Sequence, residues 1–181
     1  MRMTKSGVFF SVVLILLLAI PALGQRGSDK PRVSPNASVS QTIGVTEVTI
    51  SYGRPGVKGR TIWGELVPYG EVWRTGANEA TTISFSKDVT VEGEPLPAGT
   101  YALFTIPKEA EWIIVFNKNA QQWGAFDYNA SQDALRVKVK PQAASPQEWM
   151  SFSFEDLSSN SATVVLRWEK LAVPFKIQTA Q

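Results

Sequence analysis

The sequence contains no histidine and no cysteine among its 181 residues, and these two absences exclude several classes of protein. Without histidine the chain cannot form a Ser-His-Asp triad, an imidazole general base or a histidine-ligated zinc or copper site. Without cysteine it has no thiol nucleophile, disulfide, iron–sulfur cluster or thiolate-bound zinc. Any acid–base chemistry would have to use carboxylates, lysine or tyrosine. We therefore expect no metal site and no cofactor.

A surplus of charge of one sign is also missing from most of the chain. The formal net charge is +2, from 18 Lys and Arg against 16 Asp and Glu, and the two surplus charges are Arg2 and Lys5. Because no acidic residue precedes residue 25, the rest of the chain carries 16 charges of each sign. A neutral domain has no extended positive field to attract phosphate backbones, so nucleic-acid binding is not expected.

The longest apolar run lies at the N-terminus, and its context is typical of a secretory signal peptide over residues 1–24. A short basic segment precedes the apolar stretch Val8–Ile20, which ends at Pro21 and is followed by small residues at the cleavage positions. The alternative is an uncleaved anchor, but the stretch is shorter than the ~20 residues that span a bilayer. We predict export to the periplasm or the medium, with cleavage before Gln25 and no membrane insertion afterwards.

Short segments rich in Val, Ile, Thr, Phe and Trp recur between turn signals along the rest of the chain, which is typical of β-strands. They predict an all-β fold: a single antiparallel β-sandwich of about nine strands, jelly-roll-like or immunoglobulin-like, over residues 39–178, with a closed β-barrel as the alternative. The best helical candidate is Thr61–Val67. The polar segment 25–38, which has two prolines and no periodicity, predicts a flexible leader. The predicted strands lie at 45–52, 80–86, 89–92, 101–106, 112–116, 135–139, 152–154, 164–168 and 173–177.

One long segment, residues 52–81, interrupts this strand pattern. It combines glycine and proline with basic, acidic and aromatic residues, and a connection of this length is usually functional or disordered. Its aromatic content argues against disorder. We therefore predict one long Gly/Trp/Arg-rich loop, residues 53–80, that carries a functional site at one end of the sandwich.

The binding residues that we predict in this loop are polar or aromatic side chains. Arginine offers a planar fork for carboxylate or phosphate, asparagine both donates and accepts hydrogen bonds, and tryptophan offers a flat apolar face. Such a set suits a small polar ligand with a flat or ring-shaped apolar surface, such as a saccharide or an amino-acid-like anion. The alternative is structural: Arg74 and Glu79 would form a buried ion pair that fixes the loop, with Asn78 capping a turn. The predicted ligand-binding residues are Trp73, Arg74, Asn78 and Glu79, supported by Arg60 and Trp63.

The same segment resembles a known bacterial family. The run YGRPGVKGRTIWGELVPYGEVWRTGANEAT at 52–81, followed by LPAGTYALFTIP at 96–107, resembles the family catalogued as domain of unknown function 2911. The resemblance covers about residues 38–178 and implies an exported, single-domain protein. The family has no established activity, so the resemblance supplies no catalytic residue. Further matches to its pattern are WIIVFN at 112–117, Trp123-Gly124, Tyr128, Asp133 and LRWE at 166–169.

Two other functions stay open from the sequence. The first is a carboxylate-based, glycosidase-like hydrolase, which needs two carboxyl groups flanking a bond. Glu79 with Asp127 or Glu71 would be that pair. The second is an envelope protein–protein interaction module whose long loop docks another protein.

Residues 127–133 place oxygen side chains at alternate positions, as a calcium-binding loop does. They lack the glycine and the bidentate glutamate of an EF-hand, which favours Asx-turns and a short helix N-cap.

Overall fold

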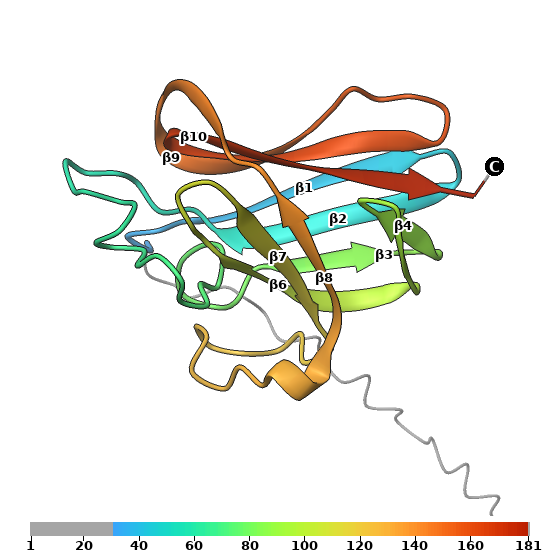
Figure 1. Ribbon diagram of the computed structural model, residues 1–181, viewed down its shortest axis with the longest axis horizontal. Coiled ribbons are helices and arrows are strands. Elements are labelled where there is room, and N and C mark those ends of the chain that lie inside the picture. The colour runs from blue at the N-terminus through green and yellow to red at the C-terminus, as the bar shows by residue number, and fades with distance from the viewer. Residues whose placement is uncertain (1–30, 181) are drawn as a thin grey trace, which may run out of the picture.

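The computed structural model describes residues 31–180, which form two antiparallel β-sheets (Figure 1). The six-stranded sheet has the order β1-β2-β3-β6-β7-β8, and the four-stranded sheet has the order β5-β4-β10-β9. The predicted all-β sandwich is confirmed, and the alternative of a closed barrel is wrong because the two sheets stay separate. The elements are β1 (Asn36–Ile43), β2 (Thr46–Gly53), β3 (Thr82–Phe85), β4 (Val89–Val91), β5 (Glu94–Leu96), β6 (Gly99–Ile106), β7 (Trp112–Asn117), the 3₁₀ turn η1 (Ala130–Gln132), β8 (Asp133–Val139), β9 (Gln142–Glu155) and β10 (Ser161–Thr179).

The buried faces of the strands follow the alternation in the sequence. In β2, Val48 and Ile50 are fully buried, whereas Glu47 on the opposite face is exposed. Such a period of two places one face of the strand on the core and the other toward solvent. The central strands β6 and β7 are apolar on both faces. On their outer side, Phe104 and Val115 form a second, smaller cluster, against which loop residues Val72, Ala125 and Tyr128 pack.

Five elements differ from the sequence predictions. β5 was not predicted, and β9 begins at Gln142 where a strand over 152–154 was predicted. β1 begins at Asn36, inside the segment 25–38 that was predicted as a leader, and it pairs with β2 along its whole length. β10 is one continuous strand where two were predicted, because its backbone continues through residues 169–172. The predicted helix at Thr61–Val67 is wrong: these residues form turns closed by a bridge between Trp63 and Val67.

The predicted signal peptide, residues 1–24, and the first part of the predicted leader, residues 25–30, lie outside the described residues. Within residues 31–180, no helix has the length and apolar character needed to cross a membrane.

Four tryptophans connect the long loop to the core of the sandwich. Trp63 and Trp73 belong to the segment between β2 and β3, which extends from one end of the sandwich in Figure 1. Trp112 lies on β7 and Trp168 on β10, so the two sheets each contribute one ring. Trp63 lies 5.0 Å from Trp112 and 5.7 Å from Trp168 between ring centroids, and Trp73 stacks on Trp168 at 5.8 Å. The loop is therefore packed against both sheets through buried aromatic rings.

Candidate functional site

The segment between β2 and β3, residues 54–81, is irregular but held by backbone hydrogen bonds along its length. Trp73 exchanges two of them with Thr105 of β6, at 2.8 and 2.9 Å. Ala80 N–H donates to the carbonyl of Gln122 at 3.0 Å. A backbone fixed at several points in this way can hold side chains in a defined arrangement, as a binding site requires.

A tight turn at residues 73–78 shapes the central part of this segment. Thr75 and Asn78 have φ angles of 53° and 65°, which are uncommon for residues other than glycine. Hydrogen bonds hold the turn: Thr81 Oγ1 donates to the Thr75 carbonyl at 2.8 Å, and Trp73 Nε1 donates to the Gly76 carbonyl at 3.2 Å. Backbone strain of this kind clusters at functional sites, where the surrounding structure maintains it.

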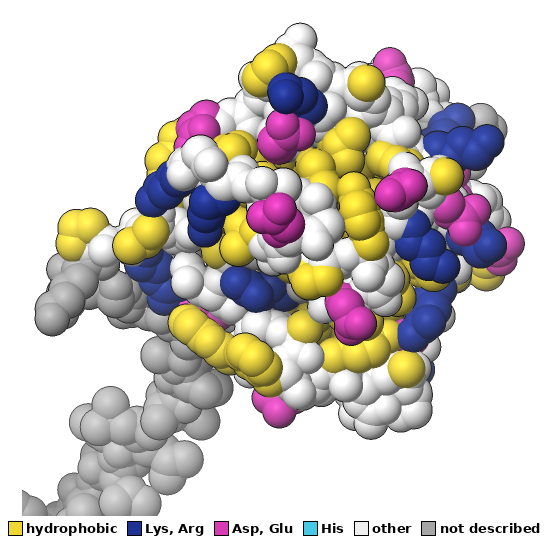
Figure 2. Space-filling view, turned by 60° about the vertical axis from the view of Figure 1, so that its left-hand side comes forward, with side chains coloured by type: hydrophobic (Ala, Val, Ile, Leu, Met, Phe, Trp, Pro, Cys, Tyr) yellow, Lys and Arg dark blue, Asp and Glu magenta, His cyan; other side chains and the backbone are white. Residues whose placement is uncertain are grey.

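This turn forms one side of a cavity of about 310 Å³ at the loop-bearing end of the sandwich. Figure 2 turns this end toward the viewer, where basic and acidic side chains surround hydrophobic side chains that reach the surface. The cavity brings together four of the six predicted binding residues, from positions spread over the loop. Those four are Arg60, Trp73, Arg74 and Asn78.

Arg74 lines the cavity without a counterion. Its guanidinium makes no ion pair or hydrogen bond with another residue in the described range, and its Nε is fully buried without a partner. Burial lowers the pKa of Arg74 from its ordinary value, but an arginine still keeps its proton at neutral pH. A cation that is partly withdrawn from water and left unpaired is unfavourable, so this position favours an anionic partner.

Arg60 adds a second positive charge to the cavity. Its Nη2 donates to the carbonyl of Gly56 at 2.6 Å and its Nε to the carbonyl of Val57 at 3.1 Å. These carbonyls fix the orientation of the guanidinium without neutralising its charge. None of the described residues that line the cavity is an Asp or Glu. The cavity is therefore positively charged within a chain that is otherwise nearly neutral.

Glu79 does not line this cavity, and its carboxylate pairs with Arg32. Arg32 Nη1 lies 2.7 Å from one carboxylate oxygen of Glu79 and 2.9 Å from the other. The structural alternative, an ion pair between Arg74 and Glu79, is wrong: Arg32, which is distant in sequence, pairs with Glu79 instead. Asn78 Nδ2 donates to the carbonyl of Ser34 at 3.2 Å, so two adjacent loop residues hold the segment that precedes β1.

Trp63, the sixth predicted residue, does not line this cavity; its ring lies 5.9 Å from that of Trp73, and it lines a neighbouring cavity of about 330 Å³. Sequence reasoning missed Val33 and Ser34, which it had placed in the leader, and Trp168, which it had assigned to the core alone. No local signal indicated that these residues line the cavity, because they lie far from the loop in the chain. Neither Glu71 nor Asp127, the predicted partners of Glu79 in a hydrolase, lines it.

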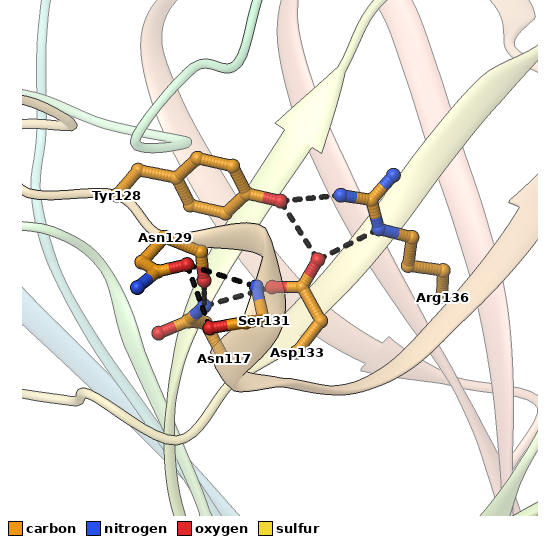
Figure 3. Close-up of polar contacts among 6 residues, drawn as sticks. All are labelled: Asn117, Tyr128, Asn129, Ser131, Asp133 and Arg136. Atoms are coloured by element: carbon orange, nitrogen blue, oxygen red, sulfur yellow. Dashed lines mark hydrogen bonds and ion pairs between the residues drawn. The ribbon is translucent and has the colours of Figure 1, made fainter.

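A second cluster of polar side chains lies at the loop between β7 and β8 (Figure 3). Tyr128 Oη donates to Asp133 Oδ2 at 2.7 Å, and Arg136 Nη2 donates to Tyr128 Oη at 2.6 Å. Asn117 Nδ2 donates to Asp133 Oδ1 at 2.7 Å, so both oxygens of this carboxylate have partners. Burial, with the hydrogen bond to Asp133, raises the pKa of Tyr128. Asn129 caps η1, which confirms the expected short helix N-cap.

The hydrogen bonds of this cluster predict that Tyr128→Phe destabilises the protein. The variant keeps the ring contact with Phe104, whose centroid lies 5.1 Å away, but loses the hydroxyl that joins Asp133 and Arg136. We expect the free energy of unfolding to fall by about 1 kcal/mol in urea titrations. Tyr69→Phe is the matched control, since that hydroxyl makes no hydrogen bond to another described residue and a change within about 0.5 kcal/mol is expected. Equal stability of both variants would contradict a stabilising role for the cluster.

Comparison with known proteins identifies a family and no characterised relative. A family model described as protein of unknown function (DUF2911) matches residues 34–177. No curated protein and no solved structure gives a significant match. The matched range includes the turn at 73–78 and ends within β10. Because the description names no activity, functional reasoning rests on the geometry of the cavity.

Proposed function

The chain belongs to the DUF2911 family, and we propose that it binds a small polar or saccharide ligand, without catalysis, in the cavity at the loop-bearing end of its sandwich. The observation that carries this proposal is the meeting of Arg60, Trp73, Arg74 and Asn78 in one cavity. Ligand sites are typically concave and mostly apolar, with a few polar groups that fix the orientation of the ligand. This cavity is concave and combines apolar side chains with two guanidinium groups and one amide, and its lining is about evenly polar and apolar.

Binding is better supported than hydrolysis by the side chains around this cavity. A glycosidase needs two carboxyl groups on either side of the bond that it breaks. The described lining contains none, and the carboxylate of Glu79 is engaged by Arg32. Together with the predicted signal peptide, this geometry leads us to propose an exported binding protein that meets its ligand in the periplasm or the medium.

A thermal-shift screen of the purified protein against saccharides, amino acids and small anions tests this proposal. A ligand present at ~100 times its dissociation constant adds about 2.7 kcal/mol of stability, because it binds only the folded state. For a domain of this size we expect a rise in Tm of about 5–10 °C. Arg74→Gln should remove the rise, whereas Lys108→Gln, which removes an exposed charge from the turn between β6 and β7, should keep it.

Two results of this screen would contradict the proposed binding site. If no compound in the screen raises Tm, the cavity does not bind this class of ligand. If a compound raises Tm equally in the wild type and in Arg74→Gln, its site lies elsewhere on the molecule. The Tm of each variant without ligand shows whether the substitution has itself altered the fold.

A further inference from the structure

We propose that the ligand of this cavity is an organic acid, with a carboxylate that pairs with Arg74 and an apolar body that fills the rest of the space. This inference rests on the proposed function and narrows it from polar ligands in general to one chemical class.

The charges of the cavity favour an acid over a neutral saccharide. Arg74 and Arg60 both line it, and neither forms an ion pair with another residue of the described chain. Glu79 lies in the same loop, but Arg32 already holds its carboxylate at 2.7 Å. A neutral sugar would displace water from these guanidinium groups and leave their charges uncompensated, which is unfavourable. A carboxylate would compensate the charge.

The shape of the donor group favours a carboxylate in particular. The Nε of Arg74 is fully buried, so the two Nη groups are the donors left to meet a ligand. A guanidinium presents such donors in a plane, in a spacing that matches the two oxygens of a carboxylate. Asn78 lies four residues further along the same turn and also lines the cavity, where its amide adds a neutral polar contact. The guanidinium therefore provides a position for the acidic group of the ligand.

The other sides of the cavity favour an organic body over a bare inorganic anion. Trp73 and Trp168 line it next to each other, with their rings 5.8 Å apart and nearly parallel. The two rings and Val67 are already almost fully buried, so the apolar surface that a ligand could cover comes mainly from Val33 and Leu66, which are 77% and 45% exposed. Sulfate or phosphate would leave this surface in contact with water, whereas an apolar body would cover it and gain about 25 cal/mol for each Å² buried. An acid with a ring or a short apolar chain satisfies both parts of the cavity.

Matched pairs of acid and neutral probe test this inference by isothermal titration of the full protein. The pairs are phenylacetate with phenylacetamide, indole-3-acetate with indole-3-acetamide, and glucuronate with glucose, and sulfate is added as an inorganic anion. We expect the acid of at least one pair to bind about tenfold or more tightly than its neutral partner. Arg74→Gln should abolish this preference, and Arg74→Lys should retain part of it because it keeps the charge but loses the planar fork. Lys108→Gln should bind as the wild type does.

The outcomes separate this inference from the proposed function. If glucose or an amide binds as tightly as its acid and Arg74→Gln weakens both, the cavity binds ligands and the acid proposal is wrong. If sulfate binds as tightly as the organic acids, the proposal that the ligand has an apolar body is wrong. If none of the probes binds at about 10 mM and the wider screen also finds nothing, both proposals are overturned. Arg74→Lys provides the decisive comparison if Arg74→Gln fails to fold.

Discussion

Replacing Trp112 by alanine is expected to lower the free energy of unfolding by about 3–5 kcal/mol. Trp112 is fully buried on β7, and its ring lies 5.0 Å from that of Trp63 and 6.4 Å from that of Trp73. Through these two loop residues it is connected to Trp168 on the opposite sheet. Truncation would open a cavity where both sheets and the long loop meet, and a close-packed interior relaxes only partly around such a space. Urea unfolding followed by circular dichroism measures the change.

Trp112→Phe is the matched variant. The Nε1 of Trp112 is buried and has no hydrogen-bond partner in the described structure, so phenylalanine loses no hydrogen bond. Alanine removes the same donor, so the two variants differ in the ring that phenylalanine keeps in the packed site and alanine replaces by a cavity. We therefore expect Trp112→Phe to be clearly more stable than Trp112→Ala. A loss below about 1 kcal/mol in the alanine variant would show that this ring is not central to the packing.

Gly53→Ala is expected to destabilise the protein by about 3 kcal/mol and to weaken ligand binding. A Cβ at position 53 would lie 2.0 Å from the carbonyl oxygen of Ala77 and 2.9 Å from its carbonyl carbon. These are backbone atoms, so no side-chain rotation relieves the clash. Ala77 N–H also donates to the carbonyl of Gly53 at 3.2 Å, and the clash would break this contact between β2 and the turn. Since Arg74 and Asn78 belong to that turn, their positions in the cavity would change.

Gly59→Ala separates this effect from the general cost of replacing a glycine. Gly59 lies in the same loop with φ of 69°, and a Cβ there would meet nothing within 4 Å. Only the strain of a left-handed conformation remains, about 1 kcal/mol. Thermal unfolding of both variants, with titration of whichever ligand the screen identifies, gives the comparison. Similar stability and affinity of the two variants would contradict the close approach of β2 and the turn.

The elements that the sequence predicted well carry apolar residues on both faces, as β6 and β7 do, or on one face in alternation with polar residues. β2 and β8 show this alternation, and both were predicted close to their observed bounds. β1 was missed because it is an edge strand of mostly small polar residues, and its start resembles a leader. The first half of β9 was missed because it is mostly exposed and contains Pro146, which an edge strand tolerates. Edge strands bury less surface, so their sequences carry a weaker pattern.

The sequence indicated which types of side chain the loop carries, but not which charged groups would pair with each other. The length and composition of the loop indicated Arg74 and Asn78 as candidates for binding. They did not indicate that Glu79 would pair with Arg32, 47 residues earlier, and that no carboxylate of the described residues would pair with Arg74. Ion pairs between distant residues depend on the path of the whole chain, which local periodicity does not encode.

By itself, then, the sequence determined what depends on composition and local pattern: the absence of histidine and cysteine chemistry, the all-β fold, and the irregular segment between β2 and β3. The tertiary structure alone decided which charges are compensated and which surfaces meet. It brought Val33, Trp73 and Trp168 around one cavity and left Arg74 there without an ion-pair partner among residues 31–180. The physical reason is that the order of the strands and the packing of both sheets against the loop set these contacts, and both are properties of the folded chain as a whole.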